Sequence, residues 1–261
     1  YNTSENVPVP LHYHKEFELF ILTEGSVKVQ IENTAVHLEK SQGVFINSGA
    51  LHSVIINNDI QCSFIAIVFS PSFIAPEYDN IYKKLIMPII RNELVIPTAL
   101  PKEVISTAIE TSEIFNSQIQ GYELYVKGNI TRMMSMCIAH GEKRNAVKKD
   151  VKSDTLKKII NYIHLNYMNN ITLEDLSTHA HTSREHLCRI FRETADVSPF
   201  VYLNRYRIMQ SAYMLKNTDK TISQISSLCG FNNNSYFGKM FLRFMNCTPS
   251  EYRRNVTSGD R

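Results

Sequence analysis

Three histidines and one glutamate near the N-terminus have the residue types and spacing of a metal-ligand set. One residue separates His12 from His14, and Glu18 follows four residues after His14. Residues two apart on a β-strand point to the same face, so these side chains should share one surface. His52, from a later strand, would face the same interior. Three imidazoles and one carboxylate suit a divalent metal ion with open coordination positions.

The same residues allow two simpler interpretations. They could line a small-molecule pocket without metal, or they could only pack and hydrogen-bond. Such a small-molecule pocket is expected to hold His14, Glu18, His52, Tyr13, Phe20 and Phe45. The sequence fixes no cofactor, and it leaves a divalent metal ion and a small organic effector such as a sugar as candidates.

The elements that would position these side chains are short strands followed by two helices. Six β-rich runs separated by turn residues predict an antiparallel barrel or jelly roll. They are Phe17–Thr23, Ser26–Glu32, Val36–Leu38, Gly43–Ile46, Ser53–Ile56 and Ser63–Phe69. After Pro101 the apolar spacing becomes helical, with a break at Gln120-Gly121, which predicts a helical hairpin. This hairpin would cover the barrel or form a dimer interface.

The spacing of His12, His14, Glu18 and Gly25 resembles the first motif of the cupin family of small, metal-binding β-barrels. The second motif is only partly present, because Asn47 stands where that pattern has proline. The resemblance implies a cupin-like barrel in the first half of the chain, and the departure weakens what it implies about a metal.

The last hundred residues contain a diverged repeat. Thr172–Ser177 aligns with Thr221–Ser226, and Ser198-Pro199 aligns with Thr248-Pro249. Each copy has a capping residue, a short amphipathic helix, a turn and a second helix, which is the element order of a helix-turn-helix motif. Between the copies, Ser198 is expected to cap a long helix that reaches Asn217.

The most specific stretch of this half is Gly230-Phe231-x3-Ser235-Tyr236-Phe237-x3-Phe241-x7-Pro249-x2-Tyr252-Arg253. Residues 154–254 resemble the DNA-binding domain of the AraC/XylS family of bacterial transcription regulators. The departures are mild, since Ser177 and Ser226 stand where alanine is typical. The resemblance implies a cytoplasmic regulator, usually an activator, that binds double-stranded promoter DNA. RNA polymerase, a small-molecule effector and a second copy of the chain are the other expected partners.

The resemblance also implies which residues meet DNA. Those expected to face base edges are Glu185, Cys188, Arg189, Asn234, Ser235, Tyr236 and Lys239. Arginine pairs with guanine, asparagine with adenine, and glutamate accepts from cytosine. Those expected at phosphates are Ser183, Arg184, Arg192, Arg205, Asn232 and Arg243.

Charge patterning supports two domains. Residues 1–140 carry 9 basic and 14 acidic side chains, whereas residues 154–261 carry 14 basic and 9 acidic ones. The polar segment 141–153 is the expected linker. We therefore predict an α+β multidomain chain: a cupin-like ligand-sensing and dimerisation domain with a helical hairpin (1–140) and an all-α tandem helix-turn-helix domain (154–261).

Several classes of protein are disfavoured. The longest apolar run, Phe64–Phe69, is far too short to cross a membrane, and no secretory leader is visible. The five cysteines form no C-x-x-C pair, so free thiols are expected. A Gly-rich phosphate loop and a Ser-His-Asp order are lacking, which argues against an enzyme. The alternatives are a metal-holding cupin sensor, a metal-dependent enzyme with a DNA-targeting tail, and a regulator whose barrel only dimerises.

Overall fold

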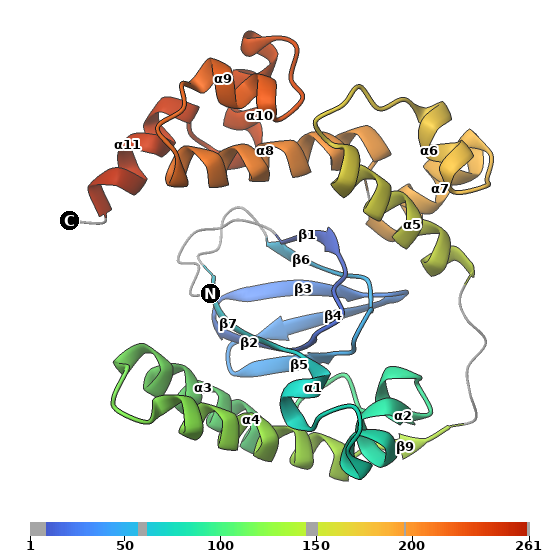
Figure 1. Cartoon of the computed structure of the whole chain (residues 1–261), viewed down its shortest axis with the longest axis vertical. Helices are drawn as coiled ribbons and strands as arrows, with labels where there is room; N and C mark the ends of the chain where they lie inside the picture. Colours follow the sequence, from blue (N-terminus) through green and yellow to red (C-terminus); the bar gives the residue numbers. More distant parts are fainter. Residues whose placement is uncertain (1–8, 57–61, 145–150, 196, 260–261) are drawn as a thin grey trace. The chain divides into compact units, whose positions relative to one another are not determined.

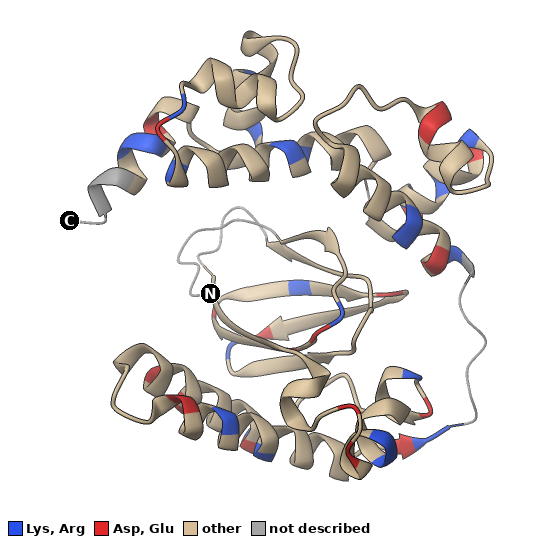
Figure 2. Cartoon of the chain, viewed as in Figure 1, with Lys and Arg blue, Asp and Glu red and all other residues tan. Residues whose placement is uncertain are grey.

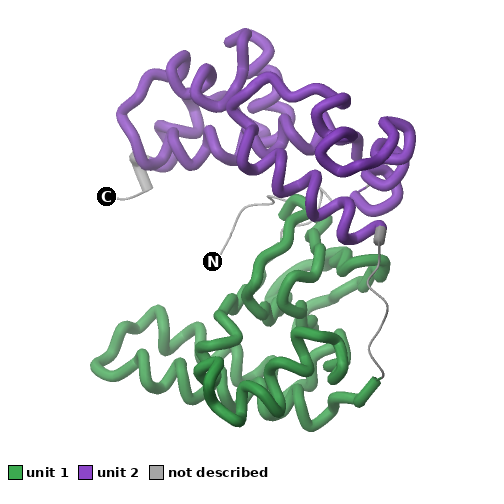
Figure 3. Tube along the Cα trace, turned by 45° about the vertical axis from the view of Figure 1, so that its right-hand side comes forward, with its two compact units in different colours: residues 1–149 green, residues 150–261 purple. Residues whose placement is uncertain are grey.

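The computed structural model describes residues 9–56, 62–144, 151–195 and 197–259. The chain divides into two compact units, residues 1–149 and 150–261 (Figure 3). The predicted linker 141–153 lies partly outside the described residues, at 145–150. Its first residues are structured, since β9 (Glu142–Lys143) pairs with β8 (Leu94–Val95). Its last residues begin helix α5 at Val151.

Antiparallel strands in two sheets form the centre of the first unit (Figure 1). One sheet has the order β1-β6-β3-β4 and the other β5-β2-β7. The strands are β1 (Val9–His12), β2 (Phe17–Glu24), β3 (Ser26–Ile31), β4 (Thr34–Glu39), β5 (Gln42–Ile46), β6 (His52–Ile56) and β7 (Ser63–Phe69). The six predicted strands are confirmed to within two residues, and β1 is an addition to them.

One apolar core fills the space between the two sheets. It takes alternate residues from strands of both sheets, including Phe20 and Leu22 of β2 and Val27 and Val29 of β3. A strand points successive side chains to opposite faces. Phe17, Leu19 and Ile21 of β2 therefore point away from this core, to the other face of their sheet.

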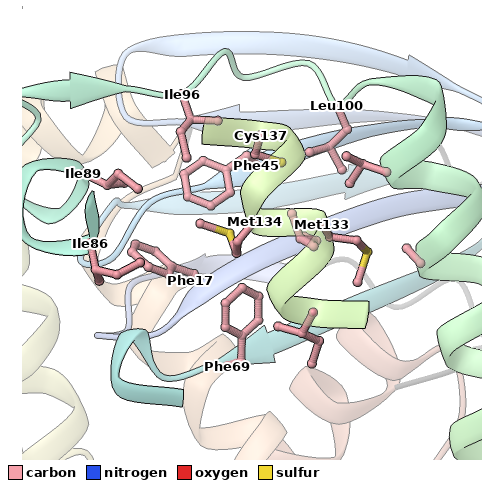
Figure 4. Close-up of a cluster of buried hydrophobic side chains, with 14 of the residues drawn as sticks. Phe17, Phe45, Phe69, Ile86, Ile89, Ile96, Leu100, Met133, Met134 and Cys137 are labelled. Atoms are coloured by element: carbon pink, nitrogen blue, oxygen red, sulfur yellow. The ribbon is translucent and has the colours of Figure 1, made fainter. Parts of the chain in front are cut away.

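A second core lies between that outer face and the helices of the first unit. Phe17, Phe45 and Phe69 of the sheet meet Met133 and Met134 of helix α4 there (Figure 4). The helices are α1 (Pro71–Ile74), the π-helix η1 (Tyr82–Ile86), α2 (Met87–Ile90), α3 (Lys102–Ser117) and α4 (Tyr122–Ala139). The helical hairpin α3–α4 thus covers the sheet, which is one of its two predicted roles.

The second unit is wholly helical over its described residues (Figure 1). Its helices are α5 (Val151–Asn166), α6 (Leu173–His179), α7 (Arg184–Ala195), α8 (Pro199–Asn217), α9 (Ile222–Leu228), α10 (Asn234–Met245) and α11 (Pro249–Gly259). The predicted repeat is confirmed as two helix-turn-helix modules, α6–α7 and α9–α10. Helix α11 was not predicted, although Thr248-Pro249 repeats the Ser198-Pro199 signal that begins α8.

Local hydrogen bonds explain where the module helices begin. Thr172 and Asp175 form a capping box at α6, and Thr221 and Gln224 form another at α9. Each satisfies two backbone groups that would otherwise lack a partner. The small Ser177 and Ser226, buried at 5% and 0% exposure, lie inside the modules. Phe191 and Phe241 are buried in the cores of these modules.

Candidate functional site

The histidine cluster lies at one end of the two sheets. His12 ends β1 and His52 begins β6, and the strand register pairs these two residues directly. Glu18 comes from β2 of the other sheet, and His14 lies in the connection between β1 and β2. One nitrogen or oxygen from each of the four side chains lies within 4.8 Å of the others. The structure therefore brings the four predicted metal ligands together.

Backbone carbonyls orient the three imidazoles. Nδ1 lies 2.9 Å from the Pro10 oxygen in His12, 3.2 Å from the Glu16 oxygen in His14 and 2.9 Å from the Ala50 oxygen in His52. A carbonyl only accepts, so each contact places a proton on Nδ1. The Nε2 atoms are then the ring nitrogens left for the rest of the cluster, and that of His14 is hydrogen-bonded to the Glu18 carboxylate. Those of His14 and His52 lie 3.1 and 3.2 Å from Oε2 of Glu18.

Burial and mutual contact set the charges of the cluster. Burial by itself would raise the pKa of Glu18, but the contacts with His14 and His52 outweigh it and lower that pKa to about 2. Burial, together with the neighbouring His52, lowers the pKa of His12 to about 4. The contact with Glu18 raises the pKa of His14. Glu18 is thus held as a carboxylate among imidazoles.

The remaining effector-pocket residues are placed differently. Phe20 shares the inter-sheet face with Glu18, but it packs in the apolar core against Phe64 with ring centroids 4.8 Å apart. Tyr13 is half-buried between His12 and His14 in the chain. Phe45 is a correction, because it pairs with Leu19 and lies on the opposite face of the sheet among the helices. The structure does not bring Phe45 to the cluster.

Helix α7 presents a charged face. Arg184, Glu185 and Arg189 are exposed, and Cys188 is half-buried. The Arg189 side chain, 62% exposed, has its Nε 3.9 Å from Glu193 and an Nη 2.7 Å from Nδ1 of His186. Arg184 lies 3.5 Å from Glu174 of α6. These are weak surface contacts, so they leave both guanidinium groups available to a ligand.

The equivalent face of α10 is nearly uncharged. Ser235 and Lys239 are exposed, and the Tyr236 hydroxyl accepts a hydrogen bond of 3.0 Å from Asn204 of α8. Asn234 donates to the Ser223 hydroxyl at 2.9 Å. The two modules therefore present different chemistry from equivalent positions.

The predicted phosphate contacts are mostly exposed. Arg192, Asn232 and Arg243 are exposed on the second unit. The Ser183 hydroxyl accepts a hydrogen bond from the backbone N–H of His186 and so caps α7. Arg205 is half-buried in α8, and burial lowers its pKa. Figure 2 shows that Lys and Arg positions are distributed along the helices of this unit.

Arg207 of α8 is a functional candidate that the sequence reasoning missed. Its Nε and Nη2 each donate a hydrogen bond of 2.7 Å, to the backbone oxygens of Tyr167 and Asn169. Its guanidinium also lies over the Phe231 ring, 5.7 Å from the centroid. One side chain thus joins the segment after α5, the long helix and the turn after α9. The Gly230-Phe231 turn was the available signal that something packs closely here.

Arg207→Lys should loosen the junction between the two modules. A lysine cannot reproduce the planar, two-pronged donation, and each hydrogen bond from a charged group contributes about 1.5–3 kcal/mol. We expect faster hydrogen exchange in residues 167–169 and 230–231. Arg192→Lys, an exposed change of the same kind, is the control. Equal exchange in the two variants would contradict the role assigned to Arg207.

Comparisons with known proteins agree with this arrangement. A model of the AraC-like ligand binding domain matches residues 2–81, and a model of a helix-turn-helix domain matches residues 176–255. The HTH-type transcriptional regulator YdeC of Bacillus subtilis is 27% identical over 97% of this chain and 89% of its own length. The chain belongs to the AraC family of transcription regulators.

Other relatives of this AraC-family chain cover nearly its whole length. The transcriptional activator RhaR of Mannheimia succiniciproducens is 22% identical over 94% of this chain and 87% of its own. The crystal structure of ToxT from Vibrio cholerae matches 97% of this chain and 96% of its own, with a TM-score of 0.53 and 22% identity. That likeness shows a shared two-domain fold.

The AraC family consists of transcription regulators, so the predicted function is confirmed as DNA-binding regulation in response to an effector. Within the described residues, no helix has the length and apolar character needed to cross a membrane. The two matched family models also assign a function to each unit, with effector binding in the first and DNA binding in the second.

Proposed function

We propose that this AraC-family regulator is an activator that binds promoter DNA through α7 and α10 together. The observation that carries this proposal is the placement of the two modules at opposite ends of α8 (Figure 1). The 19 residues of α8 span about 28 Å at 1.5 Å per residue. Successive major-groove faces on one side of B-DNA repeat at roughly 34–36 Å. A modest bend of the DNA brings both helices into adjacent grooves.

The base-reading residues are Glu185, Cys188 and Arg189 on α7 and Asn234, Ser235, Tyr236 and Lys239 on α10. Their exposure or half-burial supports this assignment. Phosphates are bound by Arg184, Arg192, Arg205 and Arg243, with Ser183 and Asn232 beside them. The Asn234 and Tyr236 side chains exchange their present partners, Ser223 and Asn204, for DNA when the complex forms.

The salt dependence of binding tests this proposal. Four arginines at phosphates predict a slope of log affinity against log salt of about −3.6. Fluorescence anisotropy of the full chain on a duplex from the promoter beside its own gene measures that slope. Arg243→Ala should reduce its magnitude by about 1 without changing sequence preference. A slope near zero, or equal affinity for a scrambled duplex, would contradict the proposal.

The effector is a small molecule, with a sugar as the first organic candidate, bound at the end of the sandwich that carries His14, Glu18, His52 and Tyr13. The polar cluster beside an apolar core supports this position. A regulatory role is favoured over catalysis, because the family members are regulators. A divalent metal ion at His12, His14, Glu18 and His52 is the second candidate occupant, favoured by the convergence of their ligand atoms.

The regulator acts as a homodimer in the cytoplasm and recruits RNA polymerase. Exposed apolar side chains at the free end of the α3–α4 hairpin support a dimer interface there. They are Phe115 at 52%, Ile119 at 54% and Leu124 at 78% exposure. The hairpin then has both of its predicted roles, since its other face covers the sheet.

A further inference from the structure

An apolar groove lies between the three-stranded sheet and the helical hairpin. It has a volume of about 550 Å³, within the range of roughly 300–1,000 Å³ that is usual for small-molecule pockets. The described residues that line it include none of the histidine cluster. Its apolar walls are chiefly Ile65, Ile67 and Val68 of β7, Phe115 of α3, and Val126 and Ile130 of α4.

Strand β7 (Ser63–Phe69) turns an open edge to this groove. Four consecutive residues of β7 line it, and since successive side chains point to opposite faces, the groove runs along the edge of the strand. Among the described residues β7 pairs only with β2. The opposite edge of the sheet is covered, because the Phe45 N–H of β5 donates to the Thr98 oxygen at 2.8 Å. Edge strands are commonly blocked by lysine or proline, and β7 contains neither.

Two polar side chains of α3 stand beside the apolar walls. Ser112 and Asn116 both line the groove, and they share one face of the helix because they are four residues apart. Within the described parts of the chain, neither side chain has a hydrogen-bond partner. Thr111 differs, since its hydroxyl donates to the Thr107 oxygen at 2.6 Å and accepts from Asn129 at 3.1 Å. Ser112 and Asn116 can therefore bind one polar group of an occupant.

The charges around the groove favour a neutral occupant. None of the described residues that line it is charged. Two charged side chains of the hairpin are engaged elsewhere, since Glu110 accepts from the Tyr125 hydroxyl and Lys127 lies over the Phe73 ring, 5.4 Å from the centroid. A charge placed in an apolar groove without a partner is costly. The excess of acidic side chains in residues 1–140 further disfavours an anion.

We propose that this groove binds an uncharged, mainly apolar organic molecule that carries one hydroxyl, carbonyl or amine group. The apolar body contacts Ile67, Phe115 and Val126, and the polar group bonds to Ser112, to Asn116 or to the open edge of β7. The groove is thus a second ligand site, outside the space between the two sheets. The site rests on the groove alone. Only an effect of its occupant on dimer formation, through Phe115, rests on the proposed function.

Binding of N-phenyl-1-naphthylamine to the full chain tests the site. This probe is uncharged and mainly apolar, it carries one N–H, and its fluorescence rises in apolar surroundings. We expect one saturable site per chain. The matched anion, 8-anilino-1-naphthalenesulfonate, is the same molecule with an added sulfonate group. It should bind at least about 10-fold more weakly, because the groove offers the sulfonate no partner.

Two matched substitutions on α3 show whether the probe lies in the groove. Ser112→Phe places a ring inside the groove and should weaken probe binding by more than about 10-fold. Ser106→Phe makes the same change at an exposed position outside the groove and should leave binding unchanged. Circular dichroism checks that both variants are folded. Equal probe binding by the wild-type chain and both variants would overturn the proposal.

Hydrogen exchange locates the probe without any substitution. The bound probe should slow exchange in β7 and in α3 and leave β1 and β6 unchanged. Slower exchange in β1 and β6 instead would overturn the proposal, since the probe would then lie between the sheets. A dimeric wild-type chain that binds no probe, beside a monomeric Ser112→Phe variant, would assign the groove to a second copy and overturn it as well. Promoter binding is measured on probe-free samples, so a failed ligand site leaves the proposed DNA-binding function standing.

Discussion

Arg189→Ala should weaken binding of the full chain to its promoter duplex by about 5- to 150-fold, the range of one lost side chain–base pairing. Arg189 is exposed on α7, and its present contacts are weak surface contacts with Glu193 and His186. Its planar guanidinium can donate two hydrogen bonds to guanine, which alanine cannot replace. The preference for one base pair in the first half-site should also relax. Anisotropy on a panel of single-base variants measures both effects.

Two matched variants control for this result. Glu193→Gln removes the carboxylate beside Arg189 and should leave promoter binding unchanged or tighter, because the guanidinium loses a competing partner. Lys239→Ala makes the equivalent change on α10, and the double variant should show additive losses, since the sites lie in separate modules. If Arg189→Ala binds with wild-type affinity and wild-type base preference, α7 does not read DNA through this residue.

Gly230→Ala should destabilise the second unit by about 3 kcal/mol or more. The glycine has φ of +81°, a conformation that costs other residues roughly 1–2 kcal/mol. A Cβ atom there would also lie 2.6 Å from the Tyr167 oxygen and 2.9 Å from the Met168 oxygen. These are backbone atoms and cannot move aside cheaply. We expect early loss of exchange protection in α9 and α10 on addition of urea, together with loss of promoter binding.

Gly121→Ala separates the two causes of that effect. Gly121 has a similar φ of +85°, but a Cβ there would meet no atom within 4 Å. Its replacement should lower the free energy of unfolding of the first unit by about 1–2 kcal/mol, which is the effect of the left-handed backbone conformation alone. The second unit should be unaffected. If Gly230→Ala costs no more than Gly121→Ala, the close approach of Tyr167 and Met168 contributes nothing to stability.

Local patterns were sufficient for much of this architecture. The repeated Thr-capped helices and the Ser-Pro start of α8 depend on hydrogen bonds within four residues, so the sequence predicts them directly. Strand boundaries followed from turn residues in the same way. His12, His14 and Glu18 do come together, but not by alternation along one strand, because His14 lies between β1 and β2 and Glu18 belongs to the other sheet.

Pairing between distant strands lay beyond such patterns. The sequence suggested that Phe20 and Phe45 line one pocket, but the register of β2 with β5 pairs Phe45 with Leu19 and turns it toward the helices. A shift of one residue would have reversed that face, and no short-range signal fixes it. The anchoring of Arg207 on Tyr167 and Asn169 likewise joins residues about forty apart.

The sequence by itself determined the family, the two-module DNA-binding unit and the types of residue in the histidine cluster. Each of these depends on residues that recur at short, regular intervals along the chain. The tertiary structure alone decided how that cluster is built. It placed His12 opposite His52, held the Nδ1 of each of the three histidines at a backbone carbonyl, and brought Glu18 from the other sheet. Such an arrangement depends on strand register and on backbone groups that no residue type specifies.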